Sequence, residues 1–123
     1  MKLAVVGSRD WQDVKLIETK LDAIRKKYKI HQIISGGAKG VDTIAVGFAK
    51  FYKIPYKEFL ADWVTYGRSA GFRRNADIIE ACDQCIAFWD GISKGTKHSI
   101  DIAKKLGKLL AVYGKDGTEI KTV

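Results

Sequence analysis

The stretch that decides the fold runs from residue 35 to residue 42 and reads Ser35-Gly36-Gly37-Ala38-Lys39-Gly40-Val41-Asp42. It follows a short apolar run, Ile33 and Ile34, and precedes a segment with helical periodicity. Three glycines within five positions let a backbone approach a ligand closely, and a helix that follows such a loop directs N–H groups and the positive end of its dipole at an anion. This junction therefore predicts a phosphate cradle and, with it, nucleotide binding.

The spacing of the glycines separates this loop from two familiar phosphate loops. Gly36, Gly37 and Gly40 follow the pattern G-G-x-x-G, which is not the dinucleotide fingerprint G-x-G-x-x-G, and no Gly-Lys-Ser/Thr follows as in a Walker loop. The alternative is a glycine-rich turn between a strand and a helix that holds no ligand. The loop by itself leaves both interpretations open.

Length and composition indicate one ordered globular domain over residues 1–123. The chain has 123 residues, of which 46% are hydrophobic and one is a proline, and this fits a single core. No apolar stretch approaches the roughly 20 residues that span a bilayer, and the apolar start is too short for a signal peptide, so we expect a cytoplasmic protein. The net charge of +8 favours anionic partners such as nucleotides or nucleic acid.

The two cysteines, Cys82 and Cys85, are interpreted as ordinary thiols rather than as a metal or redox site. Zinc would need two more ligands, and the two histidines, His31 and His98, lie far away in the sequence. The sequence therefore predicts no metal site and no cofactor.

Strand-like and helix-like segments alternate along the whole chain. The expected strands cover residues 3–6, 30–34, 56–59, 85–89 and 109–113. The expected helices cover residues 14–28, capped by Asp10, then 41–52, 75–81 and a last one that ends at Leu106 before Gly107. Residues 60–73 have the pattern of a loop, and residues 118–123 could add an antiparallel edge strand. The alternation predicts an α/β fold, a Rossmann-like three-layer open sheet, mostly parallel, of about five strands with helices on both faces.

Three loops are expected at one edge of this sheet, because each follows a strand of the same direction. They are Gly7-Ser8-Arg9, the glycine loop at 35–42, and the loop at 90–96. Ligands of open α/β sheets bind above the carboxyl ends of the strands, where the strand order switches. The three loops are therefore predicted to converge there.

Four motifs in order along the chain resemble the SLOG superfamily, closest to its small YspA-type members. They are Gly7-Ser8-Arg9 followed by Trp11, the loop at 35–42, Arg74-Asn75, and Asp90-Gly91-x-Ser93-x-Gly95-Thr96. This superfamily also contains the DprA/Smf single-stranded DNA-binding proteins and the lonely-guy phosphoribohydrolases. The resemblance implies a Rossmann-like fold and a nucleotide or nucleotide-derived signal as ligand.

The resemblance also implies a ligand site assembled from these motifs. Its expected members are Gly7, Ser8, Arg9, Ser35, Gly36, Gly37, Ala38, Gly40, Asp42, Arg74, Asn75, Asp90, Gly95 and Thr96. Arg9 could hold phosphate through its guanidinium or be a solvated charge, and one of Arg73 and Arg74 could clamp phosphate while the other is solvated. The charge of Asp42 would repel phosphate, so a capping role or a hydrogen bond to a sugar hydroxyl is favoured.

Three aromatic residues and one serine bear on what the site could do. Trp63, Tyr66 and Trp89 could stack on a base or belong to the core. The phosphoribohydrolase branch uses Gly-x-Gly-Thr-x-x-Glu, and here Ser99 stands at the place of the glutamate. A serine cannot supply that carboxylate, so no catalytic residue is assigned and whether the protein is an enzyme stays open.

The sequence thus predicts a protein that binds a nucleotide or nucleotide-derived small molecule at the carboxyl edge of the sheet, as sensor or carrier. Two alternatives remain: a hydrolase acting on a nucleotide N-glycosidic bond, and DprA-like binding of single-stranded DNA along Arg68, Arg73 and Arg74 with stacking on Trp63 or Tyr66. The aromatic residues Phe48, Phe51, Tyr52 and Phe59 exceed what one small core needs, so we also expect a homodimer.

Overall fold

The strands form one five-stranded parallel sheet in the order β3-β2-β1-β4-β5. In this computed structural model, which describes residues 1–121, the strands are β1 (Lys2–Gly7), β2 (Gln32–Ser35), β3 (Tyr56–Glu58), β4 (Gln84–Phe88) and β5 (Leu109–Tyr113). The chain builds outward from β1 to β3, returns to place β4 beside β1, and ends the sheet with β5. The strand order therefore reverses between β1 and β4, which is the switch point where ligands of such sheets bind.

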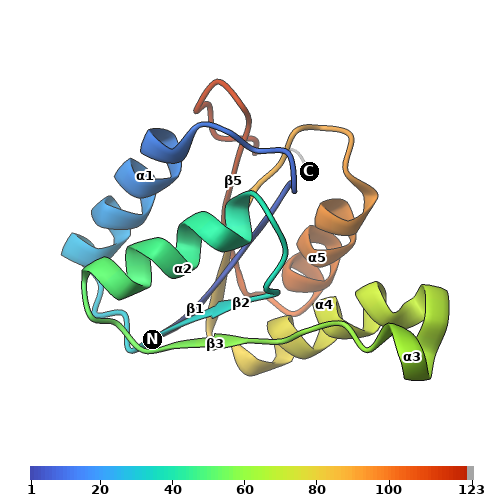
Figure 1. Cartoon of the computed structure of the whole chain (residues 1–123). Helices are drawn as coiled ribbons and strands as arrows, with labels where there is room; N and C mark the ends of the chain where they lie inside the picture. Colours follow the sequence, from blue (N-terminus) through green and yellow to red (C-terminus); the bar gives the residue numbers. More distant parts are fainter. Residues whose placement is uncertain (122–123) are drawn as a thin grey trace.

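Helices cover both faces of the sheet, as the sequence predicts. Figure 1 shows α1 (Val14–Lys27) and α2 (Val41–Phe51) on one face and α4 (Ala70–Ala81) and α5 (Lys94–Lys105) on the other. The two faces bury separate cores: Leu3 and Val5 of β1 belong to one cluster, and Ala4 and Val6 belong to the other. Successive side chains of a strand point to opposite faces, so a strand buried on both sides has the continuous apolar run seen at residues 3–6.

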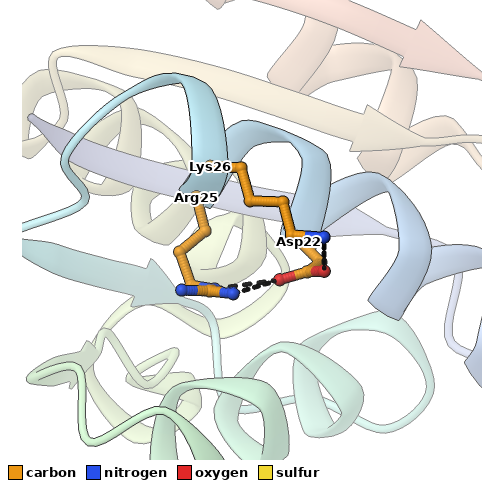
Figure 2. A network of polar contacts seen from close by, with 3 residues as sticks. All are labelled: Asp22, Arg25 and Lys26. Carbon is orange, nitrogen blue, oxygen red and sulfur yellow. Dashed lines mark hydrogen bonds and ion pairs between the residues drawn. The ribbon is translucent and has the colours of Figure 1, made fainter.

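Three charged side chains of α1 form a local network. The Asp22 carboxylate lies 2.7 Å from the Arg25 guanidinium and 3.3 Å from the Lys26 ammonium (Figure 2). The hydrogen bond from Arg25 holds the pKa of Asp22 below its usual value. The Arg25 guanidinium also lies 4.1 Å from the ring centroid of Tyr52, the residue that follows α2. At least one basic side chain of α1 therefore stabilises the packing of α1 against α2.

The cap of the first helix is Asp13 rather than Asp10. The Asp13 Oδ1 atom accepts the N–H of Leu16 over 3.1 Å, and α1 begins at Val14. Between Gly7 and this cap the chain buries Trp11, which is 5% exposed and packs edge-on against Phe88. The helix therefore starts at Val14, as the sequence predicts, and only the residue that caps it differs.

Residues 60–73 are largely helical, where the sequence indicated a loop. They contain α3 (Trp63–Tyr66), a 3-10 turn η1 (Gly67–Ser69) and the first residues of α4, which begins at Ala70 instead of about residue 75. Gly71 hides this start because glycine is a poor helix former. A Cβ at Gly71 would lie 3.5 Å from the Trp63 ring, an ordinary van der Waals distance, so this indole lies directly beside the start of α4.

The end of the described chain forms a single antiparallel bridge between Tyr113 and Glu119 rather than a full edge strand. The N–H of Ile120 donates to the carbonyl of Val112 over 2.7 Å and continues this short pairing. The last two residues of the expected strand, 122–123, lie outside the described residues. Within residues 1–121, no helix combines the length and apolar character needed to cross a membrane.

Candidate ligand-binding site

The loops after β1, β2 and β4 meet at a cavity of about 440 Å³ at the carboxyl edge of the sheet, and α3, α4 and α5 complete its walls. Pockets for small molecules are typically about 300–1,000 Å³. The convergence of the loops that the sequence predicts is therefore present. Eleven of the expected site residues line the cavity: Gly7, Ser8, Arg9, Gly36, Ala38, Asp42, Arg74, Asn75, Asp90, Gly95 and Thr96.

Three expected site residues do not line the cavity but determine the shape of the glycine loop. They are Ser35, Gly37 and Gly40. Gly40 has a φ of 71°, and a Cβ there would lie 2.5 Å from the carbonyl oxygen of Ser8. Only glycine therefore lets α2 begin so close to the first loop, where the N–H of Val41 donates to that same carbonyl over 3.3 Å. Ser35 is fully buried and accepts the N–H of Gly37 on its hydroxyl over 3.3 Å.

A carboxylate of the chain itself occupies the glycine loop. Asp42 is 7% exposed, and its Oδ2 atom accepts the N–H of Ala38 over 3.1 Å. A Cβ at Gly36 would lie 3.0 Å from the same oxygen, so this glycine makes space for the carboxylate. Burial raises the pKa of Asp42, while the Ala38 N–H and the nearby guanidiniums of Arg74 and Arg9 act in the other direction. The Asp42 carboxylate therefore stabilises the glycine loop rather than capping α2, whose N-cap residue is Gly40.

Arg74 and Asn75 join the glycine loop to the start of α5. The Nη1 atom of Arg74 donates to the carbonyl of Gly36 over 2.7 Å, and its Nε atom donates to the Asn75 side-chain oxygen over 3.2 Å. The Nδ2 atom of Asn75 donates in turn to the carbonyl of Gly95 over 3.2 Å. Burial lowers the pKa of Arg74, and the charge of Asp42 opposes that shift. Both residues lie in the second turn of α4, because this helix begins at Ala70.

The loop after β4 is ordered by Asp90 and tied to the loop after β1. The Oδ1 atom of Asp90 accepts the N–H groups of Ile92 and Ser93 over 2.9 and 2.8 Å, and the Asp90 N–H donates to the Ser8 hydroxyl over 3.2 Å. Burial acts to raise the pKa of Asp90, but these hydrogen bonds outweigh it and hold the pKa below its usual value. Ser93 caps α5 by accepting the N–H of Thr96.

Nine residues that were not among the expected site residues also line the cavity: Val6, Asp10, Trp63, Arg68, Gly71, Phe72, Ile78, Ser93 and Ser99. Trp63 and Arg68 were considered for stacking and for nucleic acid, Ser93 belongs to the fourth motif, and Ser99 stands at the place of the phosphoribohydrolase glutamate. The other five carried no chemical signal in the sequence. If the sequence analysis had predicted that α4 starts at residue 70, Gly71 and Phe72 would have been expected at the cavity. Ser93 could have been found as the residue that caps the helix beginning before Gly95.

Two residues that the sequence analysis discussed, Ser99 and Trp89, have hydrogen-bond partners within the protein. Ser99, at the place of the phosphoribohydrolase glutamate, is 2% exposed and donates to the carbonyl of Gly95 over 3.4 Å. The indole N–H of Trp89 donates to the carbonyl of Ser93 over 3.0 Å, and its ring packs against the core cluster on the α4 and α5 face. Among the described residues, no group of three or more His, Cys, Asp or Glu could hold a metal ion.

Comparison with known proteins agrees with this architecture. A family model described as "YspA, cpYpsA-related SLOG family" matches residues 1–66, which is more than half of the chain. The protein belongs to this family. Its sequence is 32% identical over 120 residues to the gene 61 protein of Mycobacterium phage D29, a match that covers 92% of this chain and 96% of the phage protein.

Solved structures of DNA processing protein A (DprA) share the fold of this SLOG protein. The Streptococcus pneumoniae protein matches with a TM-score of 0.71 and 21% identity over 92% of this chain, and the Helicobacter pylori protein with 0.62 and 21% over 93%. This chain spans 49% of the first DprA chain and 64% of the second. The predicted Rossmann-like α/β fold and the SLOG resemblance are confirmed.

Proposed function

We propose that this SLOG protein binds a nucleotide or nucleotide-derived small molecule in the cavity at the β1–β4 switch point, as a sensor or carrier. The observation that carries the proposal is the meeting of three arginines, Arg9, Arg68 and Arg74, with two aromatic rings around one cavity. The rings of Trp63 and Phe72 are 53% and 50% exposed. Guanidinium groups suit phosphate, and partly exposed aromatic rings suit a nucleobase.

Phosphate is best matched beside Arg9 and the start of α5. Asp42 already takes the N–H of Ala38, and Arg74 already bonds the carbonyl of Gly36. Arg9 is exposed at the cavity, and the N-terminal end of α5 adds the positive end of a helix dipole. We therefore infer that phosphate binds between the loop after β1 and the start of α5.

The balance of charges in the cavity favours a ligand of low charge. Its lining contains three aspartates, Asp10, Asp42 and Asp90, against the three arginines. The charges of a triphosphate would be repelled by these carboxylates. A monophosphate or a phosphodiester would leave the carboxylates free to accept hydrogen bonds from sugar hydroxyls. We therefore infer a ligand with a ribose and one or two phosphate charges.

The experiment that tests the proposal is a thermal-shift screen with mononucleotides, cyclic nucleotides, NAD, ADP-ribose and a short DNA strand. A ligand at a hundredfold over its dissociation constant stabilises the folded protein by about 2.7 kcal/mol. Arg9→Ala should weaken the binding of a phosphate ligand about tenfold. Lys15→Ala, an exposed change on α1, is the matched control and should leave binding unchanged. If no small nucleotide raises the midpoint of the wild type, the proposal is wrong.

Single-stranded DNA is a second candidate ligand, because the fold is that of DprA and the Helicobacter pylori DprA binds single-stranded DNA. In this chain the net charge is +8, and the α3 and α4 region exposes Arg68, Arg73 and Tyr66 beside the cavity. Binding to a basic groove falls steeply with salt, unlike binding of one mononucleotide in a pocket. Salt-sensitive binding of DNA without any response to mononucleotides would favour this second function.

A further inference from the structure

Residues 60–69, which we call the arm, expose an unusual amount of apolar surface next to the cavity. Val64 is 99% exposed, Leu60 is 72% exposed and Trp63 is 53% exposed. Figure 1 shows α3, which lies in the arm, at the margin of the molecule beyond the N-terminal end of α4. Large apolar side chains left exposed beside a cavity often mark a surface that contacts a ligand or partner.

Exposed local contacts hold the arm in place. Asp62 accepts the N–H of Thr65 over 3.0 Å at the start of α3. The hydroxyl of Ser69 donates to the carbonyl of Tyr66 over 2.9 Å and accepts Nε–H of Arg73 over 3.1 Å. Segments held by solvent-exposed hydrogen bonds and few buried apolar contacts open at low free-energy cost. The arm is thus a candidate for movement relative to the sheet.

Gly67 gives the arm a bend that other residues do not adopt. Its φ is 55° and its ψ is −131°, a combination that is accessible to glycine and strained for residues with a Cβ. A Cβ at this position would have no atom within 4 Å. The glycine is therefore required for its backbone conformation and not for space, as expected of a hinge.

Two side chains of the arm contact the site. The Trp63 ring lines the cavity and lies over Gly71 at the start of α4. Leu60 lies against the glycine loop, since its Cδ2 atom occupies the place where a side chain at Gly37 would begin. Movement of the arm would therefore change both the aromatic wall of the cavity and the packing of the glycine loop.

We propose that Trp63 is the residue that stacks on the base of the bound nucleotide and that the arm closes over the cavity about Gly67 to bring it there. The inference rests on the proposed function and adds to it the recognition of an aromatic base by a moving element. Closure would bury the exposed indole against the base. Stacking of this kind corresponds to a loss of about 5- to 160-fold in affinity when the aromatic residue is replaced by alanine.

The test compares AMP with ribose 5-phosphate, which carries the same sugar phosphate without a base. Dissociation constants are measured by calorimetry for the wild type, Trp63→Ala, Trp63→Phe and Gly67→Ala. Gly107→Ala is the matched control, because Gly107 also has a positive φ, 69°, with open space around an added Cβ, and lies at the far end of α5. Hydrogen exchange of the amides at 60–69 reports the closure.

The expected result is that Trp63→Ala weakens AMP about tenfold, Trp63→Phe about threefold or less, and neither changes the binding of ribose 5-phosphate. Gly67→Ala should weaken AMP at least fivefold, while Gly107→Ala leaves it unchanged. AMP, and not ribose 5-phosphate, should slow exchange at 60–69. If the wild type binds AMP and both Trp63→Ala and Gly67→Ala bind it equally well, the arm proposal is wrong and the proposed function stands. If neither AMP nor any other nucleotide binds the wild type, both fail.

Discussion

The guanidinium of Arg74 donates to the carbonyl oxygen of Gly36 over 2.7 Å, although the two residues are 38 positions apart. This bond fastens α4 to the turn of the glycine loop, and the same guanidinium faces the buried Asp42. Arg74 is therefore first a positioning residue that shapes the loop. Its contribution to ligand binding would act through that geometry as well as through its charge.

Replacement of Arg74 by alanine should lower the free energy of unfolding by about 1.5–2 kcal/mol. The variant loses a hydrogen bond from a charged donor and removes the cation that acts most strongly on the Asp42 carboxylate. Urea denaturation measures the change. Arg68→Ala, at an exposed arginine of the same cavity, should stay within about 0.5 kcal/mol of the wild type. Equal stability of the two variants would show that the bond to Gly36 contributes little.

Replacement of Asp42 by asparagine should change how stability depends on pH. Burial raises the pKa of Asp42 in the folded protein, so the unfolded chain ionises this carboxyl first. The stability that the group contributes is full below the unfolded pKa of about 3.9 and is lost as the pH rises through the raised folded pKa. The asparagine side chain of the variant cannot ionise, so the stability of the variant relative to the wild type should increase from about pH 4 toward pH 7.

The matched control for this pH dependence is Asp116→Asn. The N–H of Thr118 holds the pKa of Asp116 below its usual value, so the stability from this carboxylate is present above the unfolded pKa and lost as the pH falls. The control should therefore lose stability relative to the wild type as the pH rises through the unfolded pKa, opposite in sign to Asp42→Asn. Urea titrations at several values from about pH 3 to pH 7 distinguish the two slopes. Parallel curves for Asp42→Asn and the wild type would contradict the burial of the Asp42 charge.

The thiols of Cys82 and Cys85 should not react in the folded protein. Both side chains are buried, and burial raises the pKa of each thiol, so little thiolate is present at neutral pH. Ellman's reagent should detect no thiol in native buffer within minutes and both thiols in urea. Rapid reaction of one thiol under native conditions would mean that the α4 and β4 junction opens readily. The outcome also tests the sequence-based interpretation of these residues as ordinary thiols.

The sequence predicted the strands and the glycine turns because their signals are local. The last strand is found at 109–113 as predicted, and Gly107 follows α5 with a φ of 69°. An apolar run between polar segments and a glycine after a helix require no knowledge of the rest of the fold. These features also determined the edge of the sheet at which the loops meet.

The interior arrangement of the site depends on contacts between distant segments, and the sequence alone could not predict it. The bond of Arg74 to Gly36 requires α4 to start at Ala70, and the start was hidden by Gly71. Asp42 was expected to cap the helix or to contact a sugar hydroxyl, but it accepts the N–H of Ala38. This bond follows from the turn at Gly36, where Arg74 and Asp42 both lie against the glycine. Which charges face a ligand and which face the protein therefore became clear only in three dimensions.

Two glycines of the same region should respond to alanine in opposite directions. Gly40 has a φ of 71° and is packed against the carbonyl oxygen of Ser8, so Gly40→Ala should cost about 2–4 kcal/mol through backbone strain and a clash with the first loop. Gly47 lies within α2 with open space around an added Cβ, so Gly47→Ala should stabilise the protein by about 0.5–1 kcal/mol. For a domain of this size each kcal/mol moves the melting temperature by about 4 °C, so calorimetry resolves both changes. A small loss for Gly40→Ala would mean that the glycine loop can move away from the loop after β1, and the cavity between them would then be deformable rather than preformed.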